Sequence, residues 1–164
     1  MSETSNEHLR ELVAAANAPD QPVAVEETVP MVAFRIGARW FAVAAVRVRE
    51  VVTLESITSV PGAAKSVLGV ALVRGRLVPV IDLPGMLGAP SAGDAAITRP
   101  RLVVLSSRED EAAVIADETR GVLELPPIRE EAAGLVRGEL RWQGNIVAVL
   151  DADATVKALT AERS

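Results

Sequence analysis

The sequence contains no cysteine and no tyrosine, and its only histidine is His8. Without cysteine the chain can form no disulfide, thiolate metal site or cysteine nucleophile, and one histidine in a polar N-terminal stretch argues against histidine catalysis. Aromatic residues make up 2% of the chain and the net charge is −5, so the stacking groups and the basic surface typical of nucleic-acid binding are both lacking. These absences predict a chain that holds no metal or cofactor and binds no nucleic acid.

Long hydrophobic runs are also missing. No uncharged apolar run approaches the roughly 18 residues that a membrane-spanning helix needs. The N-terminus carries Glu3, Glu7, Arg10 and Glu11 and lacks the apolar core of a signal peptide. We therefore expect a cytoplasmic protein with no direct membrane insertion.

Aliphatic, β-branched side chains are what the chain has in quantity. Hydrophobic residues make up 49% of it, and 24 of its 164 residues are Val, which favours strands over helices. From Met31 onward apolar residues alternate in short runs, typical of strands. Hairpin turns are predicted at Arg74-Gly75-Arg76, at Ser107 to Asp110 and at Gln143-Gly144-Asn145. So many short, closely spaced strands predict an all-β fold with minor α content, either a barrel or a sandwich.

Residues 1–30 differ from the rest. Leu9, Leu12 and Val13 follow a capping-box pattern at helical spacing, and three prolines come after them in a polar stretch. This segment is predicted to be a tail and linker with a possible short helix. A solvated tail is favoured over a docking helix, because signals for short helices are weak. The folded domain is expected over residues 31–164.

An internal repeat is the most informative feature of the sequence. Residues 69–82 read GVALVRGRLVPVID and residues 138–151 read GELRWQGNIVAVLD, an offset of 69 residues. Both segments read as a hairpin with a glycine in its turn, followed by an aspartate that can cap a helix. We therefore predict two related five-stranded subdomains over about residues 35–100 and 101–150, with a C-terminal helix over about 151–160.

No catalytic constellation emerges from the residues. Asp82 and Asp151 could be imagined as paired carboxylates, but their repeat positions favour helix capping. Residues 62–66 lack the Gly that a phosphate-binding loop needs directly before Lys65. The serines have no histidine partner for a triad. The sequence therefore predicts a binding protein rather than an enzyme, with a small β-barrel hydrolase or phosphate-handling protein as the alternative class.

Several motifs resemble those of CheW-type chemotaxis coupling proteins. The segment from Gly69 to Leu83 looks like the family signature, and Val48-Arg49-Glu50-Val51 resembles its Val-x-Glu-Val segment. Further similarities lie at 57–61, 116–122 and 150–151, so the resemblance covers about residues 31–160. It implies a fold of two five-stranded SH3-like barrels around a shared core, which agrees with the repeat.

The resemblance also implies a function and a site. Family members have no enzyme activity and bridge the cytoplasmic tips of chemoreceptors to the regulatory domain of the histidine kinase CheA, in receptor arrays. Carried over by motif, Val48, Glu50 and Arg74 would lie at the receptor-binding groove, and Gly75 would shape the adjoining hairpin. From the bare sequence Arg74 reads more simply as a solvated turn residue. Glu50 is predicted to pair either with Arg74 or with a basic residue of the partner.

The chain departs from the family pattern at two positions. Leu72 stands where the family commonly has Asn, and Pro84 stands where it often has Arg. An alternative function is therefore a diverged CheW-like scaffold or localisation protein of another chemosensory or motility pathway, without kinase coupling.

Overall fold

The structure, a computed structural model, describes residues 27–89, 99–129 and 131–162. The sequence predictions for residues 1–26 lie outside this part. The order of elements is β1 Val29–Ile36, β2 Arg39–Ala44, the 3-10 turn η1 Ala45–Arg47, β3 Val48–Thr53, β4 Val67–Val73, β5 Arg76–Ile81, α2 Leu83–Met86, β6 Arg101–Ser107, β7 Asp110–Ala116, β8 Glu118–Leu125, β9 Val136–Trp142, β10 Asn145–Leu150 and α3 Ala152–Glu162.

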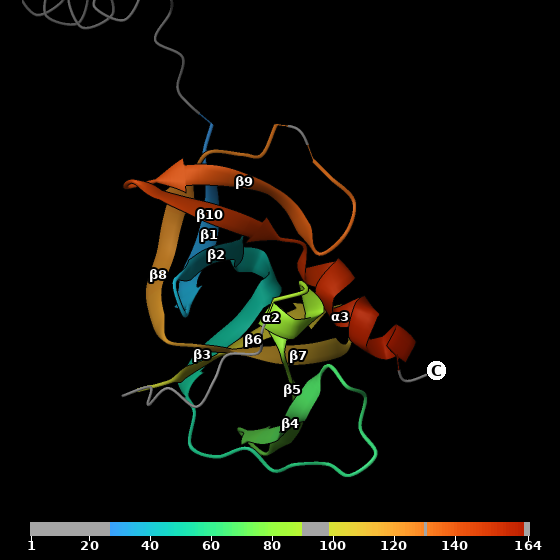
Figure 1. The fold of residues 1–164 in the computed structure, drawn as a ribbon. Coiled ribbons are helices and arrows are strands. Elements are labelled where there is room, and N and C mark those ends of the chain that lie inside the picture. The colour runs from blue at the N-terminus through green and yellow to red at the C-terminus, as the bar shows by residue number, and fades with distance from the viewer. Residues whose placement is uncertain (1–26, 90–98, 130, 163–164) are drawn as a thin grey trace, which may run out of the picture.

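The strands form two five-stranded sheets. Sheet A has the order β8-β1-β2-β10-β9, and sheet B has the order β3-β6-β7-β5-β4. In Figure 1 the strands of sheet A lie above those of sheet B, and α2 and α3 lie beside their junction. The predicted all-β class with few helices is confirmed, as two five-stranded sheets rather than closed barrels. The domain begins slightly earlier than predicted, because Val29 and Pro30 already pair with β8.

The predicted repeat places its two hairpins in equivalent positions. Hairpin β4–β5 forms one edge of sheet B, and hairpin β9–β10, 69 residues later, forms one edge of sheet A. The second strand of each hairpin pairs in parallel with a central strand, β5 with β7 and β10 with β2. The prediction of equivalent hairpins is confirmed.

The repeat offset is not constant along the chain. Ile36 and Arg39 close the first hairpin of sheet A, and Ser107 and Asp110 close the matching hairpin of sheet B, an offset of 71 rather than 69. Side chains alternate between the two faces of a strand with a period of two residues. A change of offset by two therefore leaves equivalent residues of the two halves facing inward.

The two halves of the chain exchange strands, which corrects the predicted division into residues 35–100 and 101–150. Sheet A combines β1 and β2 with β8, β9 and β10, whereas sheet B combines β6 and β7 with β3, β4 and β5. After β2 the chain passes through η1 into the other sheet instead of continuing in its own. The sequence repeat reveals which elements are alike, but it carries no information about which copy pairs with which.

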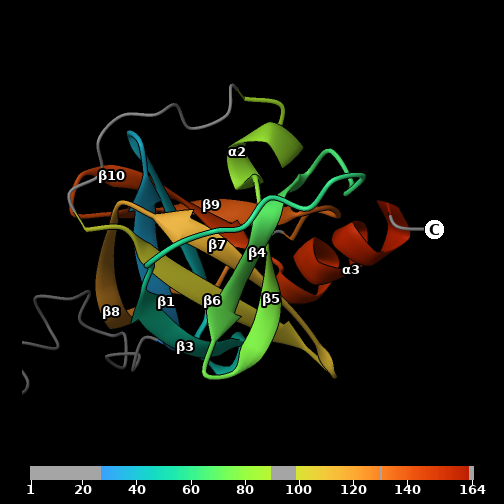
Figure 2. The same ribbon diagram turned by 90° about the horizontal axis from the view of Figure 1, so that it is seen from below.

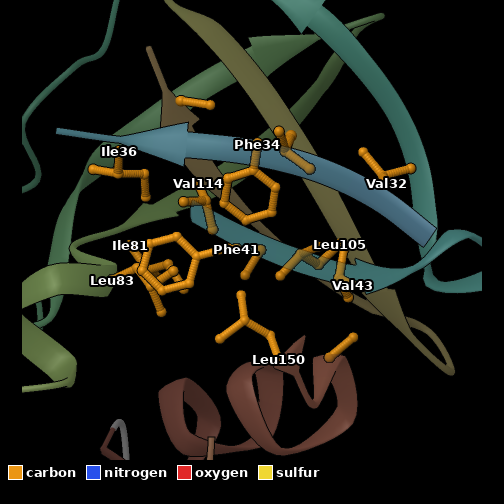
Figure 3. Close-up of a cluster of buried hydrophobic side chains, with 14 of the residues drawn as sticks. Val32, Phe34, Ile36, Phe41, Val43, Ile81, Leu83, Leu105, Val114 and Leu150 are labelled. Carbon is orange, nitrogen blue, oxygen red and sulfur yellow. The ribbon is translucent and has the colours of Figure 1, made fainter. Parts of the chain in front are cut away.

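The main core lies between the sheets and is shared by them. Phe34 and Phe41 of sheet A stack with ring centroids 5.6 Å apart, and Leu105 and Val114 of sheet B pack in the same cluster. Figure 3 shows these side chains converging with Leu150 above the helix α3. Two smaller clusters lie within the individual sheets. Since the strands of both halves bury their apolar faces in one core, we expect the two sheets to fold as one unit.

The two aspartates of the repeat are helix caps, as predicted. The amide of Gly85 donates to the Asp82 carboxylate over 3.2 Å, and the amide of Ala154 donates to the Asp151 carboxylate over 3.0 Å. Each bond satisfies an N–H group that has no partner inside the first helical turn. Pro84 lies in the first turn of α2, where a missing N–H costs nothing.

Candidate partner-binding site

Glu50 and Arg74, two of the four predicted site residues, meet in the structure. Glu50 lies on β3, one edge of sheet B, and Arg74 lies in the turn after β4, the opposite edge. The Nε of Arg74 donates to the Glu50 carboxylate over 2.5 Å, so sheet B curls until its two edges approach each other. A groove remains between these edges, lined by Val52 to Ser56 on one side and by Ala71 to Arg74 on the other.

The β4–β5 turn holds Arg74 in place. Val73 and Arg76 form the last pair of the hairpin, and the two residues between them, Arg74 and Gly75, have φ values of 49° and 82°. Two successive residues with positive φ define a type I′ turn, whose twist matches that of the flanking strands. Gly75 adopts this conformation without strain, as predicted from its position. Arg74 adopts it at a cost, as Gln143 does in the turn of hairpin β9–β10 with a φ of 48°.

Glu50 is paired with Arg74 inside the protein, which is one of the two arrangements predicted for it. Its carboxylate accepts hydrogen bonds from Arg74 and, over 3.1 Å, from Arg76. These bonds hold the pKa of Glu50 below its ordinary value of 4.5, with Arg74 the larger cause. The side chain is only 14% exposed, whereas that of Arg74 is 71% exposed. A partner therefore meets the guanidinium rather than the carboxylate.

Three residues that the sequence did not single out extend this pair into a network. The guanidinium of Arg76 bonds both oxygens of Glu111 over 3.1 and 3.3 Å, and Arg49 reaches the same carboxylate over 2.9 Å. The bonds to Glu111 and Glu50 raise the pKa of Arg76. Glu111 lies on β7, 35 residues beyond Arg76, so no sequence pattern links the two. Only the order of strands in sheet B brings them together.

Val48 lies beside this network but is half-buried. It packs against the core between the sheets, so only part of its side chain faces solvent. Its neighbour Val46 on η1 is 82% exposed. The predicted set is thus divided: Glu50, Arg74 and Gly75 form one surface feature, and Val48 supports it mainly from within.

Two leucines give the outer face of the hairpin an apolar character. Leu72 and Leu77 form a cross-strand pair next to the turn, and each is 70% exposed. A guanidinium held beside exposed aliphatic side chains is suited to bind a protein surface that carries a carboxylate next to apolar groups. In the part of the chain that the structure describes, no three histidine or acidic side chains gather as a metal site would require. None of the described helices is long and apolar enough to cross a membrane.

Comparison with known proteins places these features in a family. The family model of the CheW-like domain matches residues 30–160. Protein PilI of Pseudomonas aeruginosa is 36% identical over 112 residues, which cover 68% of this chain and 61% of PilI. The chemotaxis protein CheW of Rhizobium meliloti is 26% identical over 133 residues, or 76% of this chain and 84% of that protein. The chain thus spans less than two thirds of the length of PilI.

A solved structure shows the same fold. The scaffolding protein TtCheW from Thermoanaerobacter tengcongensis matches with a TM-score of 0.62 over 76% of this chain and 89% of that chain, at 21% sequence identity. The resemblance read from the motifs between Val48 and Leu83 is thereby confirmed at the level of family and fold.

Proposed function

This chain belongs to the family of CheW-like domain proteins, and on that premise we propose that it is a non-catalytic adaptor that couples chemoreceptors to the histidine kinase CheA in a bacterial chemosensory array. The observation that carries the proposal is the joining of Glu50 and Arg74. These residues come from two separate family motifs, and the fold assembles them into one exposed site. Residues 24 positions apart meet there only because sheet B curls.

In this proposal the Arg74 site receives the cytoplasmic tip of a chemoreceptor. Arg74 offers its terminal guanidinium nitrogens, Leu72 and Leu77 offer apolar contact, and the groove between β3 and β4 offers concave surface. The regulatory domain of CheA is the second partner, bound elsewhere on the sheets. The adaptor would then work in the cytoplasm, in arrays at the membrane. No bond is made or broken, so affinity and geometry carry the function.

The test uses a variant that keeps the turn while removing the guanidinium. Asn-Gly is a preferred sequence for a type I′ turn, so Arg74→Asn should leave the hairpin intact. The matched control is Gln143→Asn in hairpin β9–β10, where φ is 48° and Gly144 follows at 80°. Wild-type protein on an affinity resin should retain both a receptor-tip fragment and the CheA regulatory domain. Arg74→Asn should lose the fragment and keep the kinase domain, and Gln143→Asn should keep both.

Two outcomes would contradict the proposal. If Arg74→Asn retains the receptor fragment as well as the wild type does, Arg74 does not contribute to receptor binding. If the wild-type protein retains the receptor fragment but not the CheA domain, the proposed kinase coupling is wrong and the protein is a scaffold without it.

A further inference from the structure

The ion pair of Glu50 and Arg74 is one end of a row of five side chains with alternating charges. Arg74, Glu50, Arg76, Glu111 and Arg49 follow one another, each joined to the next by a contact of 2.5 to 3.1 Å. The members come from β3, the β4–β5 turn, β5 and β7. This row of charges therefore runs across sheet B, and an arginine stands at each of its two ends.

A β-bulge explains how Arg49 joins this row of charges. Val48 pairs with Leu105 and Glu50 pairs with Val104, so Arg49 is an extra residue in β3 without a partner in β6. A bulge of this kind re-aims a side chain that regular alternation would send to the other face. Arg49 and Glu50 can therefore contribute to the same network although they are adjacent in sequence.

The two arginines at the ends of the network are much more exposed to solvent than its two carboxylates. The side chains of Glu50 and Glu111 are 14% and 13% exposed, whereas those of Arg74 and Arg49 are 71% and 53% exposed. Three guanidinium groups and two carboxylates leave a net charge of +1 in a chain whose total charge is −5. Among the described residues, Arg74 donates only from Nε and Arg49 contacts only Glu111. Each end arginine therefore keeps donors for a further acceptor.

The internal repeat provides a comparison within the same molecule. At the offset of 71, Arg120 stands in the place of Arg49 and Trp40 in the place of Glu111. The guanidinium of Arg120 lies over the ring of Trp40, 5.5 Å from its centroid, and 6.0 Å from that of Trp142. Arg120 also contacts Glu118 over 2.9 Å, and Arg35 contacts the same carboxylate over 3.2 Å, so sheet A carries ion pairs at this position too. The two sheets differ in that Arg120 covers aromatic rings, whereas Arg49 contacts Glu111, which stands in the place of Trp40.

From this arrangement we propose that the partner of the Arg74 site presents two carboxylates, one bound by Arg74 and the other by Arg49. Arg76 is a positioning residue, because it bonds both partly buried carboxylates and so fixes the two end arginines relative to each other. A guanidinium fork binds a carboxylate with two parallel hydrogen bonds, which gives geometric specificity as well as energy. The inference rests on the proposed receptor-binding function and names the chemistry of the surface that fits it.

The experiment titrates the full chain with the cytoplasmic tip fragment of a chemoreceptor encoded in the same genome, by calorimetry at low and high salt. Arg49→Gln should weaken binding about tenfold and lower its salt dependence, because a partly desolvated charge pair is lost. Arg76→Gln should also weaken binding, but much less in a background that already carries Arg74→Asn. Arg120→Gln is the control and should bind as wild type does.

The partner supplies the second arm of the test. Acidic residues of the fragment are changed singly to the corresponding amides. One such change should make Arg49→Gln nearly neutral, and a different one should make Arg74→Asn nearly neutral. Coupling of this kind is absent when a variant merely loosens the fold.

The outcomes separate this inference from the proposed function. Wild-type affinity of Arg49→Gln, combined with weak binding of Arg74→Asn, would overturn the second anchor and leave the adaptor function in place. Full additivity of Arg76→Gln and Arg74→Asn would overturn the positioning role of Arg76. Unchanged affinity of Arg74→Asn would remove the site on which both proposals rest.

Discussion

Glu50 and Arg74 belong to opposite edges of one sheet, and their side chains lie 2.5 Å apart. A flat five-stranded sheet would separate its outer strands by about 19 Å, since neighbouring strands lie about 4.8 Å apart. The ion pair therefore marks where sheet B curls toward itself. Figure 2, which views the molecule from below, places hairpin β4–β5 in front of the rest of the sheet. The arginine at its tip is thus held on a support that the rest of the domain leaves open to a partner.

The two turn glycines allow a matched pair of substitutions. Gly75→Ala and Gly144→Ala should each destabilise the protein by about 1–2 kcal/mol, because an L-residue is strained at φ near 80°. An added Cβ would meet no atom within 4 Å at either position, so strain is the main cost. Thermal melts should show similar losses for both variants. Only Gly75→Ala should also weaken binding of the receptor fragment, and equal binding by the two variants would contradict a special role for the β4–β5 turn.

Acidification should reveal the Glu50 pair. The two arginines lower the pKa of Glu50 in the folded protein, and unfolding returns it to about 4.5. A group with a lowered folded pKa contributes stability that is present above the unfolded pKa and is lost as the pH falls through the folded pKa. The stability advantage of the wild type over Glu50→Gln should therefore be constant at neutral pH and shrink below pH 4.5. Chemical denaturation at a series of pH values measures it, and a difference independent of pH would refute the pairing.

Leu72 should matter for binding and hardly at all for folding. Its side chain is mostly exposed, so Leu72→Asn, which restores the residue common in the resembling family, should change the free energy of unfolding by no more than about 0.5 kcal/mol. The same change should weaken receptor binding several-fold by removing apolar contact beside Arg74. Arg141 occupies the equivalent position on β9, at the offset of 69. The control Arg141→Asn should leave binding unchanged, and a similar loss in both variants would contradict this role of Leu72.

Substitutions at Val48 and Val46 should differ in effect although the two residues lie only two positions apart. Val48→Asp would place a carboxylate against the core between the sheets, where a charge is costly, and should lower the melting temperature as well as block docking. Val46→Asp, at a position 82% exposed, should leave the melting temperature nearly unchanged. Thermal melts of the two variants make the comparison. Equal melting temperatures would show that Val48 is a surface contact alone.

Removal of residues 1–26 should leave the folded domain intact. The buried clusters of the described structure are built from residues between Val29 and Leu159. Deleting the preceding segment should therefore shift the melting temperature only slightly. The cut must stop before Val29, because β1 pairs with β8 from that residue onward. A loss of many degrees would show that the apolar stripe at Leu9, Leu12 and Val13 contributes to the core.

Local features of this protein were already determined by its sequence. The glycines at 75 and 144 specify hairpin turns, the aspartates at 82 and 151 specify helix caps, and the matching of one hairpin to the other reveals the repeat. The turns and the caps depend on residues within a few positions of one another, where backbone sterics and local hydrogen bonds dominate. The motifs around Glu50 and Arg74 identified the family for the same reason.

The tertiary structure alone decided how the halves share their strands and which charges meet. Nothing in the repeat indicates that β1 and β2 leave their own half to pair with β8 and β10. The contacts of Arg76 with Glu111 and of Arg49 with Glu111 join residues 35 and 62 positions apart, and the second also needs the bulge in β3. Such contacts depend on strand order and register, which are set by the burial of strands from both sheets against a shared core rather than by any local run of residues.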